Sequence, residues 1–271
     1  MNLTVERLKD LFVKLGGAES VVAGCNMIVE VLNEISAKYG GKDDAILNPD
    51  AISNITEIAD KIGGGGGGTP TNALVVEGVS RLRREAFSQD ENIVRAYIPN
   101  TIDLAQAAAQ GIGNVFDRCT NLASVQFAPN ITVIPLEWFA GCTSLRECIA
   151  PDVERIHATA FSECRSLENF DFRKVTFVDY EAFQGTGLVE AIMPNVRIIG
   201  GRAFYQTPLK RVYIGKDCVS IESIENEESF AQIASDAVID CGFAEGAVPG
   251  APWGAPDTVT INYNVPPPNG G

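Results

Sequence analysis

The sequence predicts a mainly β solenoid with a helical N-terminal arm. Three observations support this prediction: a motif that begins with phenylalanine recurs along the chain, a short alternating strand follows each copy, and helical periodicity dominates the first 62 residues. The recurring phenylalanines from Phe116 to Phe204 are separated by 23, 22, 22 and 21 residues. A fixed period of that length is typical of stacked repeats, each of which buries its apolar side against the next.

Residues 1–62 are expected to form the helical arm. A first amphipathic helix covers residues 4–15 and ends at Gly16, where glycine stops the helical pattern. A second helix, residues 18–39, keeps heptad spacing for about two and a half heptads, which fits either ordinary packing or a small oligomeric bundle. A third helix begins at Asn48, which is followed by proline. We interpret this arm as a segment for attachment or oligomerisation, through which the chain can form a homo-oligomer.

Residues 63–70 are predicted to be a flexible linker. They contain six consecutive glycines followed by Thr69 and Pro70. A phosphate-binding loop would need a Gly-Lys-Ser/Thr ending, and no lysine is present in this stretch. Glycine-rich chains behave as coils, so the run indicates a domain boundary.

The repeat domain is assigned to residues 71–240. In its clearest copies a cysteine lies three residues after the phenylalanine and a leucine six residues after it. An earlier copy contains Phe87, and the longer step to Phe116 indicates about six or seven inserted residues around 104–113, which we expect to form a loop. A degenerate last copy is expected to contain Phe230.

A short strand after each leucine alternates between apolar and variable residues. In the copy after Leu122, Val125 and Phe127 are apolar whereas Ser124 and Gln126 are polar. Alternation with period two sends one set inward and the other outward. Stacked copies would therefore place phenylalanine on phenylalanine and leucine on leucine in one continuous core.

The cysteines at the repeat position are interpreted as buried packing residues. Cys119, Cys142 and Cys164 share that position, and free cysteine is among the most buried residue types. Seven cysteines in 271 residues are too sparse for a disulfide scaffold. No CxxC pair or histidine accompanies them, so no metal site is predicted.

Residues 241–271 are predicted to be a C-terminal cap and tail. We expect Trp253 to pack over the last coil and the alternating segment from Thr258 to Asn264 to form a strand. The proline-rich end after Val265 is expected to be disordered.

The repeats resemble the BspA-type leucine-rich repeat family. Its motif, Ile-Gly-x-x-Ala-Phe-x-x-Cys-x-x-Leu, is similar to Ile199-Gly200-Gly-Arg-Ala203-Phe204 and to the Cys-x-x-Leu pairs. The resemblance covers about 150 residues and implies a right-handed solenoid with a parallel β-sheet along one face, as in bacterial surface and recognition proteins. Thr186 and Thr207 replace the cysteine, so the later coils are expected to pack less regularly.

The two ends of the chain resemble tail-associated proteins of phages and prophages from gut Firmicutes. The similarity lies in residues 8–17, in residues 52–62 before the glycine run, and in the C-terminal segment around Trp253. It implies a virion structural protein whose arm attaches to a phage tail.

Charge and hydropathy narrow the expected partners. The formal net charge of −14 disfavours nucleic acid, whose phosphates require clustered lysine and arginine. It equally disfavours an anionic membrane surface. No run approaches the about 18 apolar residues of a membrane span, and residues 1–10 do not have the pattern of a secretory signal.

No active site is predicted. The single histidine, His157, occupies a repeat position that also holds arginine, isoleucine, proline, aspartate and glycine, so we expect it to be exposed and not catalytic. No nucleophile motif lies near it, and no two carboxylates stand out as a glycosidase pair. No cofactor is expected, and a carbohydrate-active enzyme is the less favoured alternative.

A binding strip is predicted on the outward side of the strands, two and four residues after each leucine. A plain solvated sheet face is the competing interpretation. Apolar anchors among polar groups are typical of recognition surfaces. The strip comprises Ser124 and Gln126, Glu147 and Ile149, Asn169 and Asp171, Glu190 and Ile192, and Arg211 and Tyr213.

The sequence therefore predicts a non-enzymatic recognition or structural protein that binds a protein or a surface glycan. The favoured setting is a phage tail-associated or host-recognition appendage, located on the virion. The alternative is a bacterial cell-surface adhesin or host-interaction protein with the same kind of solenoid.

Overall fold

The computed structural model describes residues 73–75, 82, 84–222 and 228–268. The chain divides into two units, residues 1–79 and residues 80–271. The first unit contributes one described strand, β1 (Ala73–Val75). The predicted arm and linker, residues 1–70, lie outside the described residues, so the fold below is that of the second unit.

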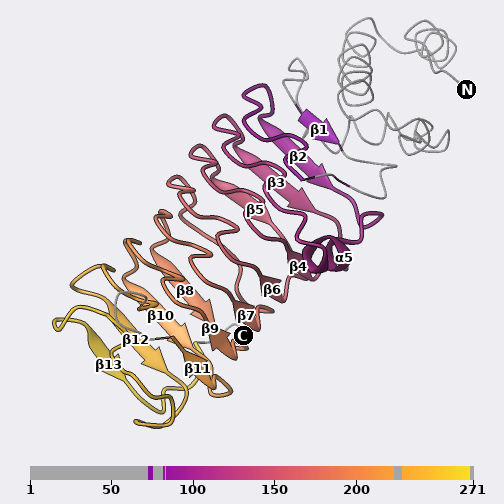
Figure 1. Cartoon of the computed structure of the whole chain (residues 1–271). Coiled ribbons are helices and arrows are strands. Elements are labelled where there is room, and N and C mark those ends of the chain that lie inside the picture. Colours follow the sequence, from indigo (N-terminus) through magenta and orange to yellow (C-terminus); the bar gives the residue numbers. More distant parts are fainter. Residues whose placement is uncertain (1–72, 76–81, 83, 223–227, 269–271) are drawn as a thin grey trace, which may run out of the picture. The chain divides into compact units, whose positions relative to one another are not determined.

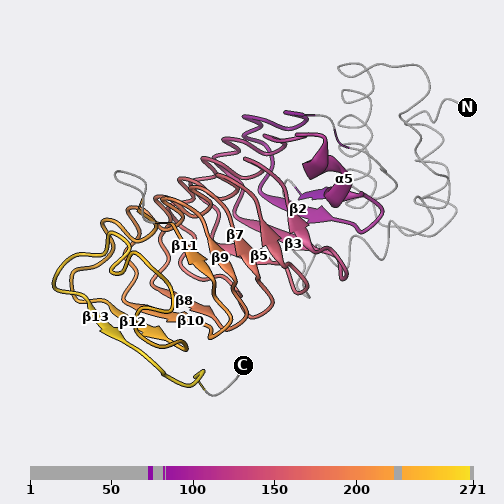
Figure 2. The ribbon, with the colours of Figure 1, turned by 60° about the horizontal axis from the view of Figure 1, so that its bottom comes forward.

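Residues 80–271 form a stack of coils whose strands are all parallel (Figure 1). Two sheets follow one side of the stack and a third sheet of two-residue strands follows another side (Figure 2). Within this unit, sheet A contains β2 (Arg95–Ile98), β3 (Ser124–Phe127) and β5 (Glu147–Ile149). Sheet C contains β8 (Glu190–Met193), β10 (Arg211–Ile214), β12 (Val238–Cys241) and β13 (Thr260–Asn262). Sheet B contains β4 (Val133–Ile134), β6 (Arg155–Ile156), β7 (Phe177–Val178), β9 (Ile198–Ile199) and β11 (Ser220–Ile221).

The strand register follows the repeat. In sheet A, Ser124 pairs with Arg95 on one side and with Glu147 on the other. In sheet B, Arg155 pairs with Val133 and with Phe177. Equivalent residues of successive coils therefore lie side by side, which confirms the prediction of a mainly β chain with parallel sheets.

A continuous stack of phenylalanine rings fills the core. Neighbouring ring centroids lie 5.2–5.7 Å apart along the whole series. The leucines of the motif are fully buried as well. The prediction that phenylalanine packs on phenylalanine is thus confirmed, including the first copy and the degenerate last one. The stack comprises Phe87, Phe116, Phe139, Phe161, Phe183, Phe204 and Phe230.

The turns that carry the phenylalanines from Phe87 to Phe204 each have two residues in the left-handed region. In one coil these are Glu137, with φ of 54°, and Gly141, with φ of 71°. Their N–H groups donate to the next coil, from Glu137 to the carbonyl of Ala158 at 3.1 Å and from Gly141 to that of Ser162 at 2.7 Å. These inter-coil bonds offset the cost of left-handed backbone at a non-glycine residue.

The cysteines at the repeat position bond neighbouring coils to each other. The Sγ atoms of Cys119, Cys142 and Cys164 donate to the phenylalanine carbonyl of the preceding coil at 2.9–3.0 Å. All three are fully buried, as predicted, and all three are free thiols. Burial raises the pKa of Cys119 to about 12 and that of Cys142 well above its ordinary value, so both remain protonated thiols.

The two threonine copies use a different hydrogen bond. The hydroxyls of Thr186 and Thr207 donate to the phenylalanine carbonyl three residues earlier in their own coil, at 2.9 and 2.8 Å. The expectation that these coils pack less regularly is wrong. The rings of Phe204 and its two stacking neighbours are within 2° of parallel.

The insertion before Phe116 forms a helix and not the expected loop. Helix α5 (Leu104–Ala109) begins at Asp103, whose side chain accepts a hydrogen bond from the N–H of Gln106 at 2.8 Å. The alanine-rich composition has high helix propensity, and Leu104 and Ala107 are buried. The segment therefore adds its own small apolar face to the core.

The segment predicted as cap and tail adds a further coil. β13 pairs in parallel with β12, with Thr260 opposite Val238. Trp253 is fully buried, its Nε1 donates to the carbonyl of Pro249 at 2.9 Å, and its own carbonyl accepts from the N–H of Phe230. Trp253 therefore closes the apolar interior at this end of the described chain.

Sheets A and C are interrupted at residues 168–172, where no strand is present. Phe170 holds the inward position that the smaller Cys148 and Ala191 hold in the flanking coils. Its ring packs 5.5 Å from that of Phe161 and 5.3 Å from that of Phe183. We attribute the interruption to this ring, since the added volume displaces the backbone from the ladder.

Candidate recognition surface

The predicted strip lies on the outward side of sheets A and C. Val125, Ala191 and Val212 point inward and are at most 2% exposed, whereas their neighbours along the strands point outward. This alternation is the geometry that the sequence predicted. Because equivalent residues pair in register, the strip runs across the coils and not along one strand (Figure 1).

Nine of the ten predicted strip residues are exposed or half-buried. Ile149 is 43% exposed and is flanked by exposed Glu147 and Gln126, so it is an apolar side chain in a polar setting. Ile192 is half-buried. The exposed or half-buried members are Ser124, Gln126, Glu147, Ile149, Asn169, Asp171, Glu190, Ile192 and Arg211.

Tyr213 was predicted to be an exposed member of the strip, but the chain near Val265 covers it. The residue is 4% exposed, and its hydroxyl donates to the carbonyl of Val265 at 3.3 Å. Val265 itself is anchored by a hydrogen bond from its N–H to the carbonyl of Cys241 at 2.9 Å. The chain after β13 therefore lies over this end of the strip, which leaves the coils from Ser124 to Arg211 as its open part.

Charged side chains on the strip pair within and between coils. Arg211 Nη1 lies 3.0 Å from Glu190 Oε2 on the neighbouring strand. Arg173 Nη2 lies 2.6 Å from Asp171 Oδ2, and this guanidinium lowers the pKa of the Asp171 carboxyl. These pairs restrict the side chains they join, so part of the strip is held in place before any ligand arrives.

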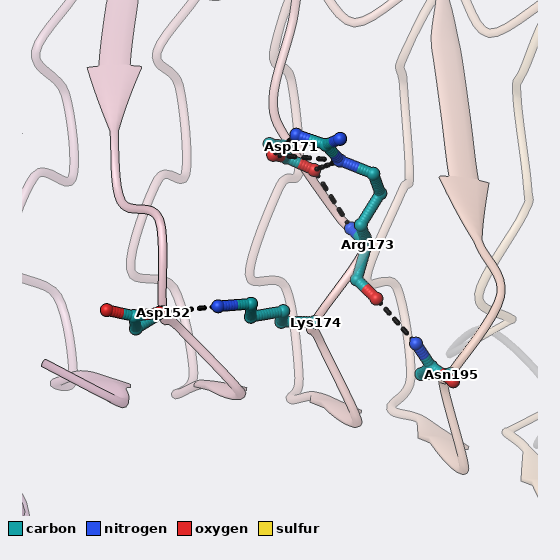
Figure 3. Close-up of polar contacts among 5 residues, drawn as sticks. All are labelled: Asp152, Asp171, Arg173, Lys174 and Asn195. Atoms are coloured by element: carbon teal, nitrogen blue, oxygen red, sulfur yellow. Dashed lines mark hydrogen bonds and ion pairs between the residues drawn. The ribbon is translucent and has the colours of Figure 1, made fainter. Parts of the chain in front are cut away.

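A polar corner joins the strip to sheet B (Figure 3). Lys174 Nζ lies 2.5 Å from Asp152 Oδ1 in the preceding coil, and Asn195 Nδ2 donates to the carbonyl of Arg173 at 2.6 Å. The other oxygen of Asp152 accepts from the N–H of Asn130 at 2.7 Å. The hydrogen bond from Asn130 and the contact with Lys174 lower the pKa of Asp152.

Beyond the corner, an open groove of about 760 Å³ lies beside sheet B. Sequence reasoning did not select its residues as a site. The available signal was a change of charge between equivalent parts of the coils, at Glu154 after Val153, at Arg197 after Val196 and at Asp217 before Cys218. The groove is lined by Glu154, Lys174, Thr176, Asn195, Arg197, Lys216, Asp217, Cys218 and Val219.

His157 is half-buried and not exposed as expected. Its Nδ1 lies 3.9 Å from Asp179 Oδ2, and burial lowers its pKa against the opposing effect of that carboxylate. Among the described residues, its side-chain partner is this carboxylate and not a serine, threonine or cysteine. The geometry therefore places His157 in a surface ion pair and gives no nucleophile–base arrangement.

The described part of the chain contains neither a cluster of metal ligands nor a membrane-spanning helix. No group of three or more histidine, cysteine, aspartate or glutamate side chains there could hold a metal ion. No helix among those same residues is long and apolar enough to cross a membrane.

The stacked parallel coils, with phenylalanine and leucine in fixed inward positions, define a leucine-rich-repeat solenoid. Residues 110–232 match the model of the BspA type leucine-rich repeat region in six copies. This part of the chain therefore carries BspA-type leucine-rich repeats, as its motif predicted. No curated protein matches the sequence.

Three solved structures of leucine-rich repeat proteins are similar to this chain. A leucine-rich repeat protein of T. pallidum is 19% identical, with a TM-score of 0.39, over 72% of this chain and 78% of its own. A leucine-rich cell surface protein of Faecalibacterium prausnitzii is 17% identical, with a TM-score of 0.34, over 71% and 65%. A leucine-rich repeat protein of Bacteroides ovatus is 16% identical, with a TM-score of 0.35, over 73% and 55%.

Proposed function

We propose that the protein is a non-enzymatic recognition protein whose strip on sheets A and C binds a protein or a glycan at a bacterial surface. The observation behind the proposal is the contrast between the two sides of each strand. Inward positions such as Val125 and Ala191 are apolar and fully buried, whereas the outward positions beside them differ in charge and size from coil to coil.

This contrast separates what holds the fold from what can recognise a partner. Because outward residues do not enter the ring stack, they can change without a change in the core. Ile149 is an exposed apolar side chain among polar neighbours, which is the composition of a binding anchor with a polar surround. The pair between Arg211 and Glu190 holds one side of the open strip in place.

Two settings fit this function. In the first, the protein is a tail-associated or host-recognition appendage of a phage, attached through residues 1–62. In the second, it is a bacterial cell-surface adhesin or host-interaction protein. The first rests on the resemblance of the chain ends and the second on the repeat alone.

The binding proposal is tested with the fluorescently labelled full chain and a panel of bacterial cells. We expect saturable binding to some cells. Loss of binding after treatment of the cells with proteinase K would indicate a protein ligand, and loss after periodate oxidation would indicate a glycan. Absence of binding to every cell type would refute the proposal.

The site is tested with Ile149→Asp, which places a charge in the middle of the open strip. We expect at least a tenfold loss of affinity, because an apolar anchor is replaced by a hydrated carboxylate. Gln110→Asp adds the same charge at an exposed position after α5 and should bind like the wild type. Equal binding by both variants would place recognition elsewhere on the molecule.

The setting is tested separately by fractionation. The phage setting predicts that the protein copurifies with intact particles after induction, whereas the adhesin setting predicts that it stays with cells. Release of soluble sugars from cell-wall glycan by the purified chain would instead support the carbohydrate-active enzyme.

A further inference from the structure

We propose a second binding site, for an uncharged oligosaccharide, in the groove beside sheet B. None of its lining residues belongs to the predicted strip, so this site does not depend on the function proposed for sheets A and C. Its volume of about 760 Å³ lies within the range of about 300–1,000 Å³ that is typical of ligand sites.

The groove runs along the stack. Glu154, Thr176, Arg197 and Val219 each come directly before a strand of sheet B, in four successive coils. Neighbouring parallel strands lie about 4.8 Å apart, so this row spans about 14 Å. A row of that length suits several joined sugar rings better than a single compact molecule.

Some polar groups of the groove are already engaged. Lys174 points to Asp152, and the amide nitrogen of Asn195 points to the carbonyl of Arg173 (Figure 3). Thr176 Oγ1 donates to the carbonyl of Glu154 at 3.1 Å. These contacts hold the wall of the groove and leave other groups to meet a ligand.

The remaining charged groups of the groove have no side-chain partner among the described residues. They are the carboxylates of Glu154 and Asp217, the guanidinium of Arg197 and the ammonium of Lys216. All four residues are exposed. The site therefore offers two carboxylates as hydrogen-bond acceptors and two cations as donors. The net charge of these four unengaged groups is zero.

This balance indicates the chemistry of the ligand. A carboxylated or phosphorylated ligand would meet Glu154 and Asp217 as well as the two cations, and like charges disfavour binding. A sugar hydroxyl both donates and accepts, so vicinal hydroxyls can use carboxylates and a guanidinium together. Val219 is 58% exposed at the end of the row and provides an apolar surface for the C–H face of a sugar ring.

The test uses isothermal titration calorimetry of the full chain with neutral oligosaccharides of three to six residues: malto-, cello-, manno- and chito-oligosaccharides. Oligogalacturonates serve as the acidic counterpart. We expect one of the neutral series to bind and to strengthen with chain length until the groove is filled. Failure of all the neutral series, or tighter binding of oligogalacturonate, would overturn the assignment.

The site is checked with the double variant Glu154→Ala/Arg197→Ala, which leaves the net charge unchanged. We expect at least a tenfold loss of oligosaccharide affinity. The matched control, Arg146→Ala/Glu168→Ala, removes one charge of each sign from exposed positions beside the strip and should bind the oligosaccharide normally. Circular dichroism of both variants would establish that they fold.

The proposals for the groove and for the strip can be refuted independently of each other. Ile149→Asp should leave oligosaccharide binding intact, and Glu154→Ala/Arg197→Ala should leave any strip-dependent binding to cells intact. Unchanged oligosaccharide affinity in the groove variant would refute the groove site without affecting the proposal for the strip.

Discussion

The cysteine coils and the threonine coils use one buried position in different ways. In the first, a thiol donates to the preceding coil, as from Cys142 to Phe116 at 3.0 Å. In the second, a hydroxyl donates within its own coil, as from Thr186 to Phe183 at 2.9 Å. The ring stack runs through both with centroid distances of 5.2–5.7 Å. The rings, and not the group three residues later, therefore set how the coils pack.

Removal of a stacked ring should destabilise the chain most. Phe161→Ala in a cysteine coil and Phe204→Ala in a threonine coil should each lower the free energy of unfolding by about 3–5 kcal/mol. Both rings are fully buried and stacked on two neighbours, so the two losses should be similar. Urea denaturation followed by circular dichroism measures them.

A third variant, Phe87→Ala, gives a reference for the loss expected at the end of the ring stack. Phe87 is 7% exposed and has a single stacking partner in the described stack, so Phe87→Ala should cost less. A much greater loss for Phe161→Ala than for Phe204→Ala would show that the thiol bonds carry part of the stacking energy, so that the two kinds of coil would not be equivalent.

The reactivity of the thiols tests how well the repeat position of Cys119 is buried. Burial raises the pKa of Cys119 from its ordinary value of 9.0 to about 12, so its thiolate is about a thousandfold rarer than that of a free thiol at pH 8. Cys218, with a pKa of about 11, should react before it. Iodoacetamide labelling read by peptide mass spectrometry checks this order, with guanidinium-denatured protein as the control. Equal labelling of Cys119 in native and denatured protein would contradict it.

Exchanging the two residues should have a smaller effect. Cys142→Thr should destabilise the chain by about 1 kcal/mol, because the carbonyl of Phe116 loses the thiol that donates to it. Thr186→Cys should be close to neutral, since its N–H still donates to the carbonyl of Phe183. A stability gain from Cys142→Thr would show that the bond between coils contributes nothing. Denaturation midpoints measure both variants.

The smallest expected effect is on the pH dependence of stability. It concerns His157, which lies at the surface and not in the ring stack. Burial lowers the pKa of His157, so the unfolded chain takes up a proton more readily than the folded one. The folded state therefore favours the neutral imidazole, and the free energy of unfolding falls as the pH drops below about 6.5, the ordinary pKa of histidine. His157→Gln should remove this part of the pH dependence, worth less than about 1 kcal/mol between about pH 7.5 and 5.5. An unchanged slope would refute the assignment.

The repeated residues predicted most of the fold because the solenoid is one local interaction repeated many times. Alternation after Leu122 and Leu209 was sufficient to place Val125 and Val212 inside. The helix at 104–109 was missed because an insertion has no repeat to compare with, although Asp103 and the alanines that follow were visible signals.

The candidate sites were less predictable, because the exposure of their residues depends on contacts with segments that are distant in the sequence. Alternation correctly turned Tyr213 outward, but no local rule shows that the chain near Val265 returns to cover it. The groove beside sheet B brings together residues from four coils, and the side chains that remain unengaged there become apparent only when Lys174 and Asn195 are seen to be paired.

The interruption at residues 168–172 has a mechanical consequence. On the strip side a backbone ladder links adjacent coils within sheet A and within sheet C, but it is missing on both sides of residues 168–172. The N–H groups of these residues donate no hydrogen bond to the coil of β5, and the coil of β8 donates to them once, from Val189 to Glu168 at 3.4 Å. The turn side and sheet B still join this coil to the preceding one, for example from Phe139 to Ala160 at 2.9 Å and from Thr176 to Glu154 at 2.8 Å. A solenoid pulled along its axis would therefore first yield on the strip side at the coil that contains Phe170 and bend there about the two sides that remain bonded.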